Sequence, residues 1–275
     1  MNMRFILALI MIAMMATGTF AAQSGPVPGK FDYYVFSLSW QPAFCESHQD
    51  KKECNTWKEG DFDTKNLVLH GLWPSQNGDK KHTYGYCNVS KQIKSLDTAS
   101  NWCNMPFPKL SPTTIDTLGV VMPGYQSCLE NHEWYKHGVC SGLDADTYFA
   151  TAARFVEGVA TTRLGAVISA NVGNSVASSD LTAAAQQDFG DKSGTLRFIC
   201  QNGMLSEVRF YLKKDLPAQG GISADMLVTP DASEKSSCPS TIEIDRFGSD
   251  VKGSIVDLIK KVARDASCAR ETGCI

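Results

Sequence analysis

The stretch FDYYVFSLSW, residues 31–40, carries bulky side chains in alternation and is rich in aromatic and β-branched types. This pattern predicts a β-strand. Pro42 ends the predicted strand, because proline lacks the backbone N–H that a central strand needs. Cys45 and Cys54 then enclose a short charged loop, and they are close enough in sequence to pair with each other.

A second apolar run, LVL at residues 67–69, predicts a short buried central strand. We expect it to stop at His70, because the glycine that follows lets the backbone turn sharply. Residues 75–104 have no sustained period and many polar side chains, so they predict a long loop region held by Cys87 and Cys103. Loops of this length in a compact domain are often binding surfaces.

The rest of the chain mixes helical and strand patterns. Ser111 followed by Pro112 is typical of a helix start, and Gly138 is typical of a helix end. The helical patterns cover residues 112–122, 125–138, 144–159, 179–190 and 251–266. The strand patterns cover residues 195–200, 204–212 and 241–244, with a tight-turn signal at 201–203. Without regular β–α alternation, a repeat or a linker, this order predicts an α+β fold in a single domain.

Residues 1–22 predict a secretory signal peptide. Arg4 supplies the positive start, and residues 5–16 are an unbroken apolar run. Thr19 and Ala21 offer small side chains at the two positions that signal peptidase reads. The apolar run is too short for a membrane span of about 20 residues, so no membrane anchor is expected. The domain would then be residues 23–275, a monomer that is periplasmic or secreted.

Charge and cysteine content narrow the function. The formal charge of −3 becomes −4 when Arg4 leaves with the signal peptide, which argues against salt-driven wrapping of nucleic acid but not against a local phosphate contact. All 10 cysteines follow the signal peptide, which predicts five disulfides in an oxidising compartment. They allow roughly 945 pairings. No CxxC pair or cysteine–histidine cluster at zinc-ligand spacing occurs, so no metal and no cofactor are expected.

The segment CLENHEWYKHGVC, residues 128–140, concentrates groups that move protons and hold anions. If the segment is helical, Glu133 and His137 share a face, and so do His132 and Lys136, because each pair is four residues apart. A carboxylate beside an imidazole raises the pKa of that imidazole, and an ordinary histidine pKa near 6.5 suits proton transfer. The spacing alone describes a solvated helix face equally well.

His70 is a second candidate, because it follows an apolar strand at the point where strands deliver side chains to the end of a sheet. Trp73 and Pro74 follow it closely. On these residues alone, His70 is either a satisfied core residue or an active-site group. Trp73 is either core filler or a stacking platform.

Two histidines with a glutamate and a lysine, without a metal or nucleophile motif, suit one reaction. A neutral imidazole removes a proton from a hydroxyl, an imidazolium protonates a leaving oxygen, and cations hold the charge on the phosphorus between them. With the ribose 2′-OH as the attacking group, this is metal-independent RNA cleavage through a 2′,3′-cyclic phosphate. DNA lacks that hydroxyl, so no DNA cleavage is expected.

HGLWP at residues 70–74 and HEWYKHGVC at residues 132–140 resemble the two active-site segments of the ribonuclease T2 family of secreted endoribonucleases. LSWQPAFC and SCLENHEW are most similar to bacterial periplasmic members. The resemblance covers residues 31–247 and leaves a C-terminal helical tail at 248–275. It implies an α+β fold with a central antiparallel sheet flanked by helices and stapled by disulfides. Residues 129–131 lack the aromatic side chains of many relatives, so base preference is not implied.

The resemblance implies a role for each matching residue. His70 and His137 match the paired catalytic histidines, and Glu133 matches the third catalytic residue. A phosphate-binding histidine, a lysine that stabilises the pentavalent phosphorane and a base-stacking aromatic are matched by His132, Lys136 and Trp73. Our hypothesis for proton transfer is that His137 is the base toward the 2′-OH, because Glu133 supports its proton affinity. His70 would then protonate the 5′-oxygen.

The resemblance also suggests two disulfides, Cys87–Cys140 and Cys200–Cys238. Elimination and proximity then pair the remaining cysteines as Cys45–Cys54, Cys103–Cys128 and Cys268–Cys274.

Three other functions fit parts of the sequence. A non-catalytic RNA-binding or storage relative would lose a catalytic histidine, and both are present. A toxin or effector RNase would share the same catalytic residues. A cysteine hydrolase that uses Cys140 with His137 conflicts with the even cysteine count, which predicts that Cys140 is bonded.

Overall fold

The structure is a computed structural model that describes residues 26–79, 83–229 and 235–248. The predicted signal peptide, the predicted helix at 251–266 and the Cys268–Cys274 pair lie outside the described residues. Within these ranges, no helix is both long and apolar enough to cross a membrane.

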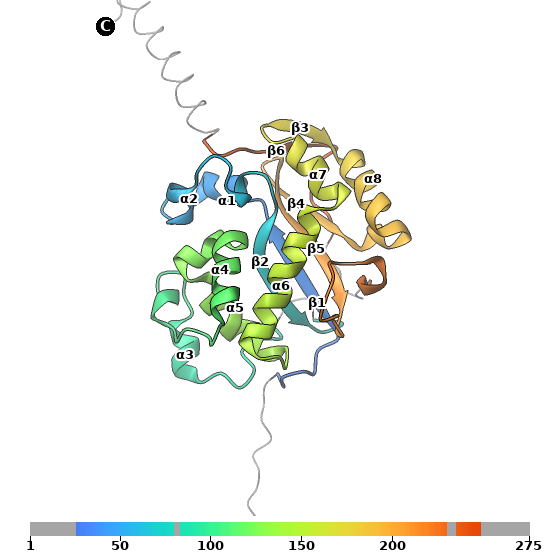
Figure 1. Cartoon of the computed structure of the whole chain (residues 1–275). Coiled ribbons are helices and arrows are strands. Elements are labelled where there is room, and N and C mark those ends of the chain that lie inside the picture. Colours follow the sequence, from blue (N-terminus) through green and yellow to red (C-terminus); the bar gives the residue numbers. More distant parts are fainter. Residues whose placement is uncertain (1–25, 80–82, 230–234, 249–275) are drawn as a thin grey trace, which may run out of the picture.

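One sheet forms the centre of the molecule (Figure 1). Its strands are β1 (Tyr33–Ser39), β2 (Val68–Ser75), β3 (Asn174–Ala177), β4 (Arg197–Gln201), β5 (Met204–Lys213) and β6 (Thr241–Ile244). The strand order is β2-β1-β5-β6-β3, and β4 pairs with β5 off this path. The pairings among the described strands are antiparallel, except for a short parallel contact between β5 and β6.

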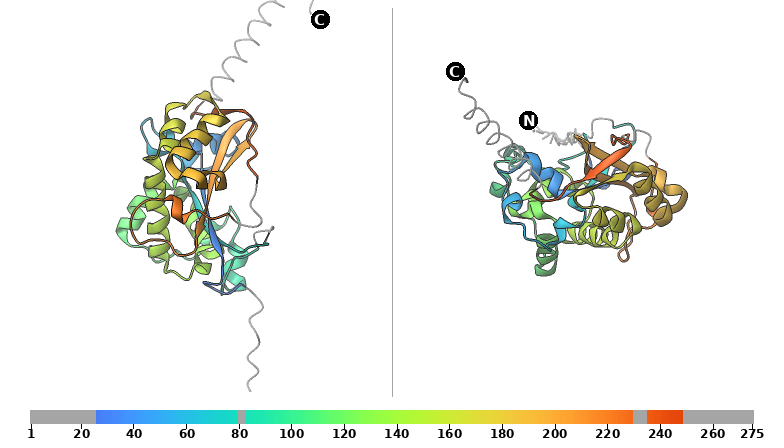
Figure 2. Two further views of the ribbon diagram at one scale, coloured as in Figure 1. Left: turned by 90° about the vertical axis from the view of Figure 1, so that its right-hand side faces the viewer. Right: turned by 90° about the horizontal axis from the view of Figure 1, so that it is seen from above.

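Helices flank this sheet, which confirms the predicted α+β architecture. Those that the structure describes are α1 (Gln41–Ser47), α2 (Glu53–Thr56), α3 (Lys91–Leu96), α4 (Pro112–Val121), α5 (Leu129–Lys136), α6 (Ala145–Ala160), α7 (Arg163–Ala170) and α8 (Ser178–Phe189). α6, α7 and α8 cover one face of the sheet (Figure 1 and Figure 2). α4 and α5 lie beside its β2 edge (Figure 1).

The alternation in β1 separates the core from the opposite face of the sheet. Phe36 is fully buried on the helical side, where its ring lies 5.8 Å from that of Phe155 on α6 and 6.0 Å from that of Phe210 on β5. Val35 points the other way, into a small cluster that includes Tyr211. A strand with two buried faces is stabilised mainly by apolar burial, at roughly 25 cal/mol per Å².

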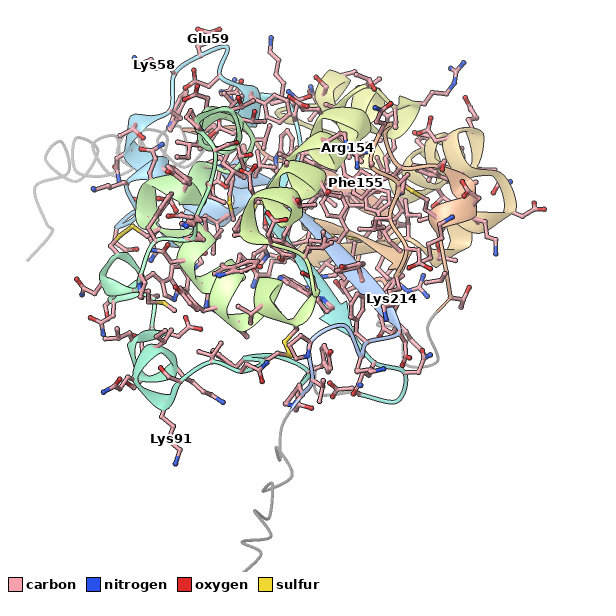
Figure 3. All side chains as sticks on the ribbon, turned by 60° about the horizontal axis from the view of Figure 1, so that its bottom comes forward. Lys58, Glu59, Lys91, Arg154, Phe155 and Lys214 are labelled. Atoms are coloured by element: carbon pink, nitrogen blue, oxygen red, sulfur yellow. A yellow bond between two sulfur atoms is a disulfide. The ribbon has the colours of Figure 1, made fainter. Side chains whose placement is uncertain are left out.

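Arg154 connects α6 to the loop that follows β5. Its guanidinium lies over the ring of Phe155 at 4.7 Å (Figure 3). It also donates to the carbonyl of Pro217 at 2.6 Å. Gly158, one turn further along α6, lets this loop approach closely, because a Cβ at Gly158 would lie 3.0 Å from the Cα of Gly221.

Several predicted boundaries are confirmed. α4 begins after Ser111, whose hydroxyl accepts from the Thr114 N–H at 3.3 Å. α6 begins after Asp144, whose carboxylate accepts from the Thr147 N–H at 3.0 Å. The predicted turn between β4 and β5 is present, with positive φ at the residues of its centre, 202–203.

The prediction for the second apolar run was wrong in two respects. β2 continues through His70 to Ser75 and lies at the edge of the sheet, not at its centre. The backbone does not turn at Gly71, which pairs with Ser37 in β1. Pro74 fits inside this strand because an edge strand has one side without ladder hydrogen bonds.

The helix prediction for residues 125–138 also needs correction. A 3₁₀ segment, Pro123–Ser127, precedes α5, and Cys128 separates the two with a left-handed backbone at φ 60°. His137, not Gly138, caps the C-terminal end of α5. Gly138 is required for space instead, because a Cβ there would overlap the Trp134 ring.

Short elements account for the other differences. α1 and α2 occupy the two ends of the segment at 45–54 that was predicted as a charged loop, and α3 lies within the predicted loop at 75–104. α7 and β3 were not predicted. A helix of four to eight residues completes only about one or two turns, which is too few repeats of its period to be recognised in the sequence.

Four disulfides join cysteines of the described ranges: Cys45–Cys54, Cys87–Cys140, Cys103–Cys128 and Cys200–Cys238. Two of them hold the segment 83–104 along α5. Cys87–Cys140 lies beyond the C-terminal end of this helix, and Cys103–Cys128 lies just before its N-terminal end. The segment between them is therefore tied against the helix at both ends.

Glu130 on α5 is a buried acid. Its side chain is only 2% exposed, and burial raises its pKa from 4.5 to about 7.

Replacing both Cys103 and Cys128 with Ser should lower the free energy of unfolding by about 3 kcal/mol, because the unfolded chain regains the freedom of a loop of that length. Activity should fall further than stability explains, since the segment at 83–104 would then be tied to α5 at only one end, by Cys87–Cys140. The matched control is the Cys200→Ser/Cys238→Ser pair, which should destabilise with less loss of activity. Urea unfolding and RNA cleavage assays measure both, and equal activity losses in the two variants would contradict the expectation.

Replacing Glu130 with Gln should stabilise the protein at pH 8 and change little at pH 4. The folded chain keeps a proton on Glu130 that the unfolded chain releases above pH 4.5, so stability falls as the pH rises from 4.5 to about 7. A glutamine side chain at this position has no charge to bury, so this part of the pH dependence should disappear. Melting temperatures across pH 4 to 8 test it, with exposed Glu59→Gln as the control.

Candidate active site

The six predicted site residues come together at the β2 edge of the sheet. β2 supplies two of them and the α5 segment supplies four: His70, Trp73, His132, Glu133, Lys136 and His137. The Oε1 atom of Glu133 lies 4.0 Å from Nε2 of His70 and 3.9 Å from Nε2 of His132. A ring nitrogen of His137 belongs to the same group, since the ligand atoms of His132, Glu133 and His137 all lie within 4.8 Å of one another.

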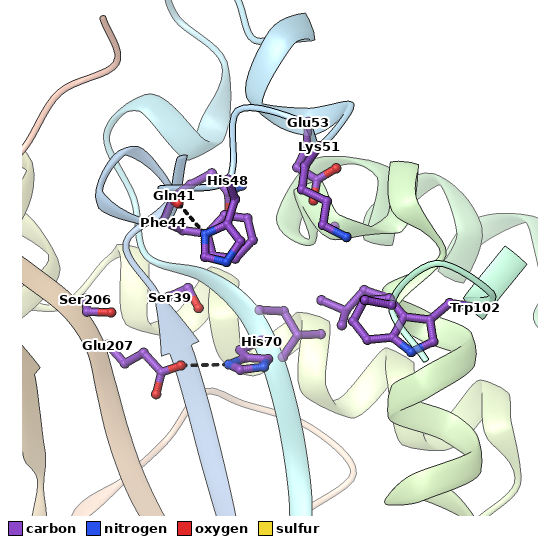
Figure 4. A pocket seen from close by; sticks show the side chains of 14 residues that line it. Ser39, Gln41, Phe44, His48, Lys51, Glu53, His70, Trp102, Ser206 and Glu207 are labelled. Atoms are coloured by element: carbon purple, nitrogen blue, oxygen red, sulfur yellow. Dashed lines mark hydrogen bonds and ion pairs between the residues drawn. The ribbon is translucent and has the colours of Figure 1, made fainter. Parts of the chain in front are cut away.

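A β-bulge places His70. In the pairing of β1 with β2, Ser37 is opposite Gly71 and Leu38 is opposite Leu69, so His70 is the extra residue. A bulge locally breaks the alternation of a strand and can re-aim a side chain. The imidazole of His70 consequently points into the site and is 34% exposed. Its Nδ1 atom lies 2.8 Å from Oε1 of Glu207 on β5 (Figure 4).

Gly71 gives Glu133 its room. A Cβ at this position would overlap both Oε2 of Glu133 and Nε1 of Trp73. These two atoms form a hydrogen bond, in which the Trp73 indole N–H donates to Oε2 of Glu133 at 2.7 Å. The absence of a side chain at Gly71 therefore lets a helix carboxylate lie directly against the sheet.

Glu133 is 1% exposed, and its two oxygens have different surroundings. Oε2 accepts from Trp73, while Oε1 has no hydrogen-bond donor among the described residues and faces the two histidine Nε2 atoms. Burial raises the pKa of this carboxyl, and the charges of His132, His70 and Lys136 and the Trp73 hydrogen bond oppose that rise. The site thus holds a buried carboxylate next to cationic groups.

His132 is held on the side away from Glu133. Its Nδ1 lies 2.6 Å from Oδ1 of Asp97, a fully buried carboxylate in the segment tied along α5. Asp97 also accepts from the Trp102 indole at 2.8 Å and from the Tyr86 hydroxyl at 2.7 Å. The Trp102 ring lies 4.7 Å from the imidazole of His132, so this imidazole is fixed by both a hydrogen bond and packing.

His70 has a comparable partner in Glu207. Burial lowers the pKa of His70, but the hydrogen bond and charge of Glu207, with the charge of Glu133, outweigh burial and raise it. Burial also disfavours the charged form of Glu207, yet His70 and Arg209 lower its pKa to about 2. Both shifts favour an imidazolium–carboxylate pair.

His137 lies at the C-terminal end of α5. Its side chain is 8% exposed. The ring packs 5.4 Å from that of Trp73 and 6.0 Å from that of His132. Trp73 therefore packs against the rings of His70 and His137 and donates a hydrogen bond to Glu133. Base stacking by Trp73 stays a prediction.

A cavity of about 230 Å³ opens beside His70 (Figure 4). It extends from Glu207 and His70 toward α1 and the 3₁₀ turn at Trp102–Asn104. Side chains of Phe44, His48, Lys51, Trp102 and Leu129 line its far part. Phe44 and His48 stack with their rings 4.1 Å apart.

The cluster could also hold a metal ion, because His132, Glu133 and His137 offer nitrogen and oxygen donors within 4.8 Å of one another. Two imidazoles and a carboxylate are a donor set that zinc accepts. The sequence did not indicate this, since the three residues do not follow a common zinc-ligand spacing.

Glu207 and Asp97 are the site residues that sequence reasoning missed. A weak signal existed for Glu207, because Glu207 and Arg209 put two charges on one face of a predicted strand. None existed for Asp97, whose 35-residue distance from His132 is closed only by the folded segment.

Comparison with known proteins identifies related sequences and folds. A sequence profile of the Ribonuclease T2 family matches residues 31–219. The chain belongs to the Ribonuclease T2 family. It is 31% identical over 239 residues to Ribonuclease I of Escherichia coli, covering 80% of this chain and 88% of that protein. It is 28% identical over 218 residues to Ribonuclease DdI of Dictyostelium discoideum, covering 76% and 86%.

Solved structures share the fold. RNase NT, crystallised with 5′-AMP, superposes with a TM-score of 0.54 at 19% identity, covering 79% of this chain and 99% of that one. Trichomaglin, described as an S-like ribonuclease, superposes with a TM-score of 0.53 at 16% identity, covering 80% and 100%. At these identities the likeness concerns the fold.

Gly71→Ala should reduce RNA cleavage by about 100-fold, because the added methyl group displaces the Glu133 carboxylate and the Trp73 indole together. It should also destabilise the protein by about 1–3 kcal/mol through overpacking. Gly119→Ala is the matched control, since Gly119 is exposed on α4 with open space at its Cβ position. Cleavage rates measured below the melting temperature of each variant test this, and wild-type activity in Gly71→Ala would contradict it.

Proposed function

We propose that this chain is an endoribonuclease that cleaves single-stranded RNA by metal-independent transesterification through a 2′,3′-cyclic phosphate. One observation carries the proposal: Oε1 of Glu133 lies within 4.0 Å of the Nε2 atoms of both His70 and His132, and His137 belongs to the same cluster. Three imidazoles around a buried carboxylate supply a base, an acid and an anion-binding group. The family relationship supports the reaction class.

In this reaction His137 removes the proton from the ribose 2′-OH, and the 2′-oxygen attacks the adjacent phosphorus. A pentavalent phosphorane forms, and His132 and Lys136 hold its non-bridging oxygens. The P–O5′ bond then breaks as His70 gives its proton to the 5′-oxygen. The products are a 2′,3′-cyclic phosphate and a free 5′-hydroxyl.

The contacts of His70 support its role as the acid more directly than the sequence did. The sequence argument for this direction was a Glu133 carboxylate that raises the proton affinity of His137. The structure gives His70 its own carboxylate, Glu207 at 2.8 Å, and the pKa of His70 is raised. A raised pKa favours the imidazolium, which is the form that can donate a proton to the leaving oxygen.

The cavity beside His70 supports a place for the leaving nucleoside. If His70 protonates the 5′-oxygen, the nucleoside that carries this oxygen lies on the His70 side of the phosphate. The cavity of about 230 Å³ begins there and is lined by the rings of Phe44 and Trp102. Aromatic rings stack on any base, so this arrangement favours broad base tolerance.

We also propose that the protein is a periplasmic or secreted monomer. The predicted signal peptide at 1–22 supports export, and the disulfides support an oxidising compartment, where such bonds persist. RNA is the proposed substrate, and DNA is not cleaved because it lacks the 2′-OH.

Purified protein should cleave a short RNA in the presence of EDTA and leave cyclic-phosphate ends. The matched substrate carries a single 2′-deoxyribose before the scissile phosphate and should resist cleavage at that position. Mass spectrometry of the products identifies the ends. Loss of cleavage with EDTA, or cutting at the deoxyribose, would contradict the proposed mechanism.

His70→Phe and His137→Phe should each lower kcat by about 1,000-fold, because each removes one partner of acid–base catalysis. The wild type should show a bell-shaped pH dependence from two imidazole-like groups. Circular dichroism and thermal melting establish that the variants fold. Substantial cleavage by either folded variant would overturn the assignment of the pair.

A further inference from the structure

Both oxygens of Glu207 have defined partners. Oε1 lies 2.8 Å from Nδ1 of His70. Oε2 accepts from the Ser37 hydroxyl at 3.1 Å and from Nε of Arg209 at 2.8 Å. Ser37 comes from β1 and Arg209 from β5, so the carboxylate is held by two central strands of the sheet.

The bonds of Glu207 fix which nitrogen of His70 faces the substrate. Nδ1 must carry a hydrogen to donate to a carboxylate whose pKa is about 2. Nε2 is then the atom directed into the cluster, toward Oε1 of Glu133 at 4.0 Å. A free imidazole would rotate about its χ angles and exchange these two nitrogens.

Other charged groups surround His70 without duplicating this contact. Glu133 faces Nε2 from α5, and Arg209 opposes the protonated ring from β5. His48, Lys51 and Glu53 line the same cavity from the α1–α2 region. Glu207 is the described carboxylate within hydrogen-bond distance of Nδ1.

We propose that Glu207 is a positioning residue for His70: it orients the ring with Nε2 toward the phosphate and keeps it protonated as the proton donor. This assignment rests on the proposed function, in which His70 is the acid. Glu207 does not touch the reacting atoms, so it acts through His70 alone. Its loss should therefore change kcat and its pH dependence more than KM.

Asp97 offers an internal comparison, because it holds Nδ1 of His132 at 2.6 Å in the same manner. His132 is proposed to bind the phosphate and not to transfer a proton. Loss of the Asp97 charge should consequently raise KM. Comparison of the Glu207 and Asp97 variants therefore distinguishes a defect in proton donation from a defect in anion binding.

The test compares Glu207→Gln, Glu207→Asp and Asp97→Asn in the full chain. Glu207→Gln should lower kcat by at least roughly 10- to 100-fold, the cost of losing a carboxylate that orients a metal-bound histidine. The alkaline limb of the pH–rate profile should move to lower pH, because His70 would lose its proton more easily. Glu207→Asp keeps the charge and should recover part of kcat and part of the position of the alkaline limb. Asp97→Asn should raise KM and leave the alkaline limb in place.

An independent readout needs no substrate. NMR titration follows the imidazole protons, and the signal absent from His70→Phe identifies His70. Its pKa should lie above 6.5 in the wild type and fall in Glu207→Gln. An unchanged His70 pKa with an unchanged alkaline limb in folded Glu207→Gln would overturn the proposal. If the wild type does not cleave RNA, but the His70 pKa still falls in Glu207→Gln, the proposed function is refuted and the Glu207–His70 coupling stands.

Discussion

The buried carboxylate of Glu133 is the constraint on which the rest of the site depends. Burying an acid costs free energy unless donors and cations compensate for the lost water. Here the Trp73 indole donates to one oxygen, and the Nε2 atoms of His70 and His132 face the other. Each compensating group comes from β2 or α5, so the strand edge and the helix must meet closely. Gly71 permits that approach because it has no side chain between them.

Two more carboxylates complete the arrangement from outside. Asp97 and Glu207 each bond the Nδ1 atom of a site histidine, which leaves the Nε2 atoms turned toward Glu133. Asp97 reaches its place through a segment tied to both ends of α5 by disulfides, whereas Glu207 is carried by a central strand. The histidines are thus oriented by two parts of the fold that do not depend on each other.

The polar residues of the site lie at the sheet edge, apart from the apolar core that stabilises the fold. The core lies on the helical face, where Phe36, Phe155 and Phe210 pack together. The polar residues gather where β2 bulges at His70 and β5 exposes Glu207 to the cavity. Because these polar groups bond one another rather than intrude on the apolar layer, the chain can hold three histidines and three acids in one place without disrupting the core.

By itself the sequence determined the α+β class, the strand at residues 31–40, the helices that begin after Ser111 and Asp144, and the residue types of the site. Those features are local: alternation, caps and dense titratable residues appear within a few positions of one another. Only the tertiary structure decided that His70 occupies a bulge in an edge strand, that Gly71 serves for space and not for a turn, and that Asp97 and Glu207 hold the two histidines. The physical reason is that a hydrogen bond between residues 35 or 137 positions apart leaves no trace in local periodicity. It exists only once strand pairing and disulfides have brought the segments together.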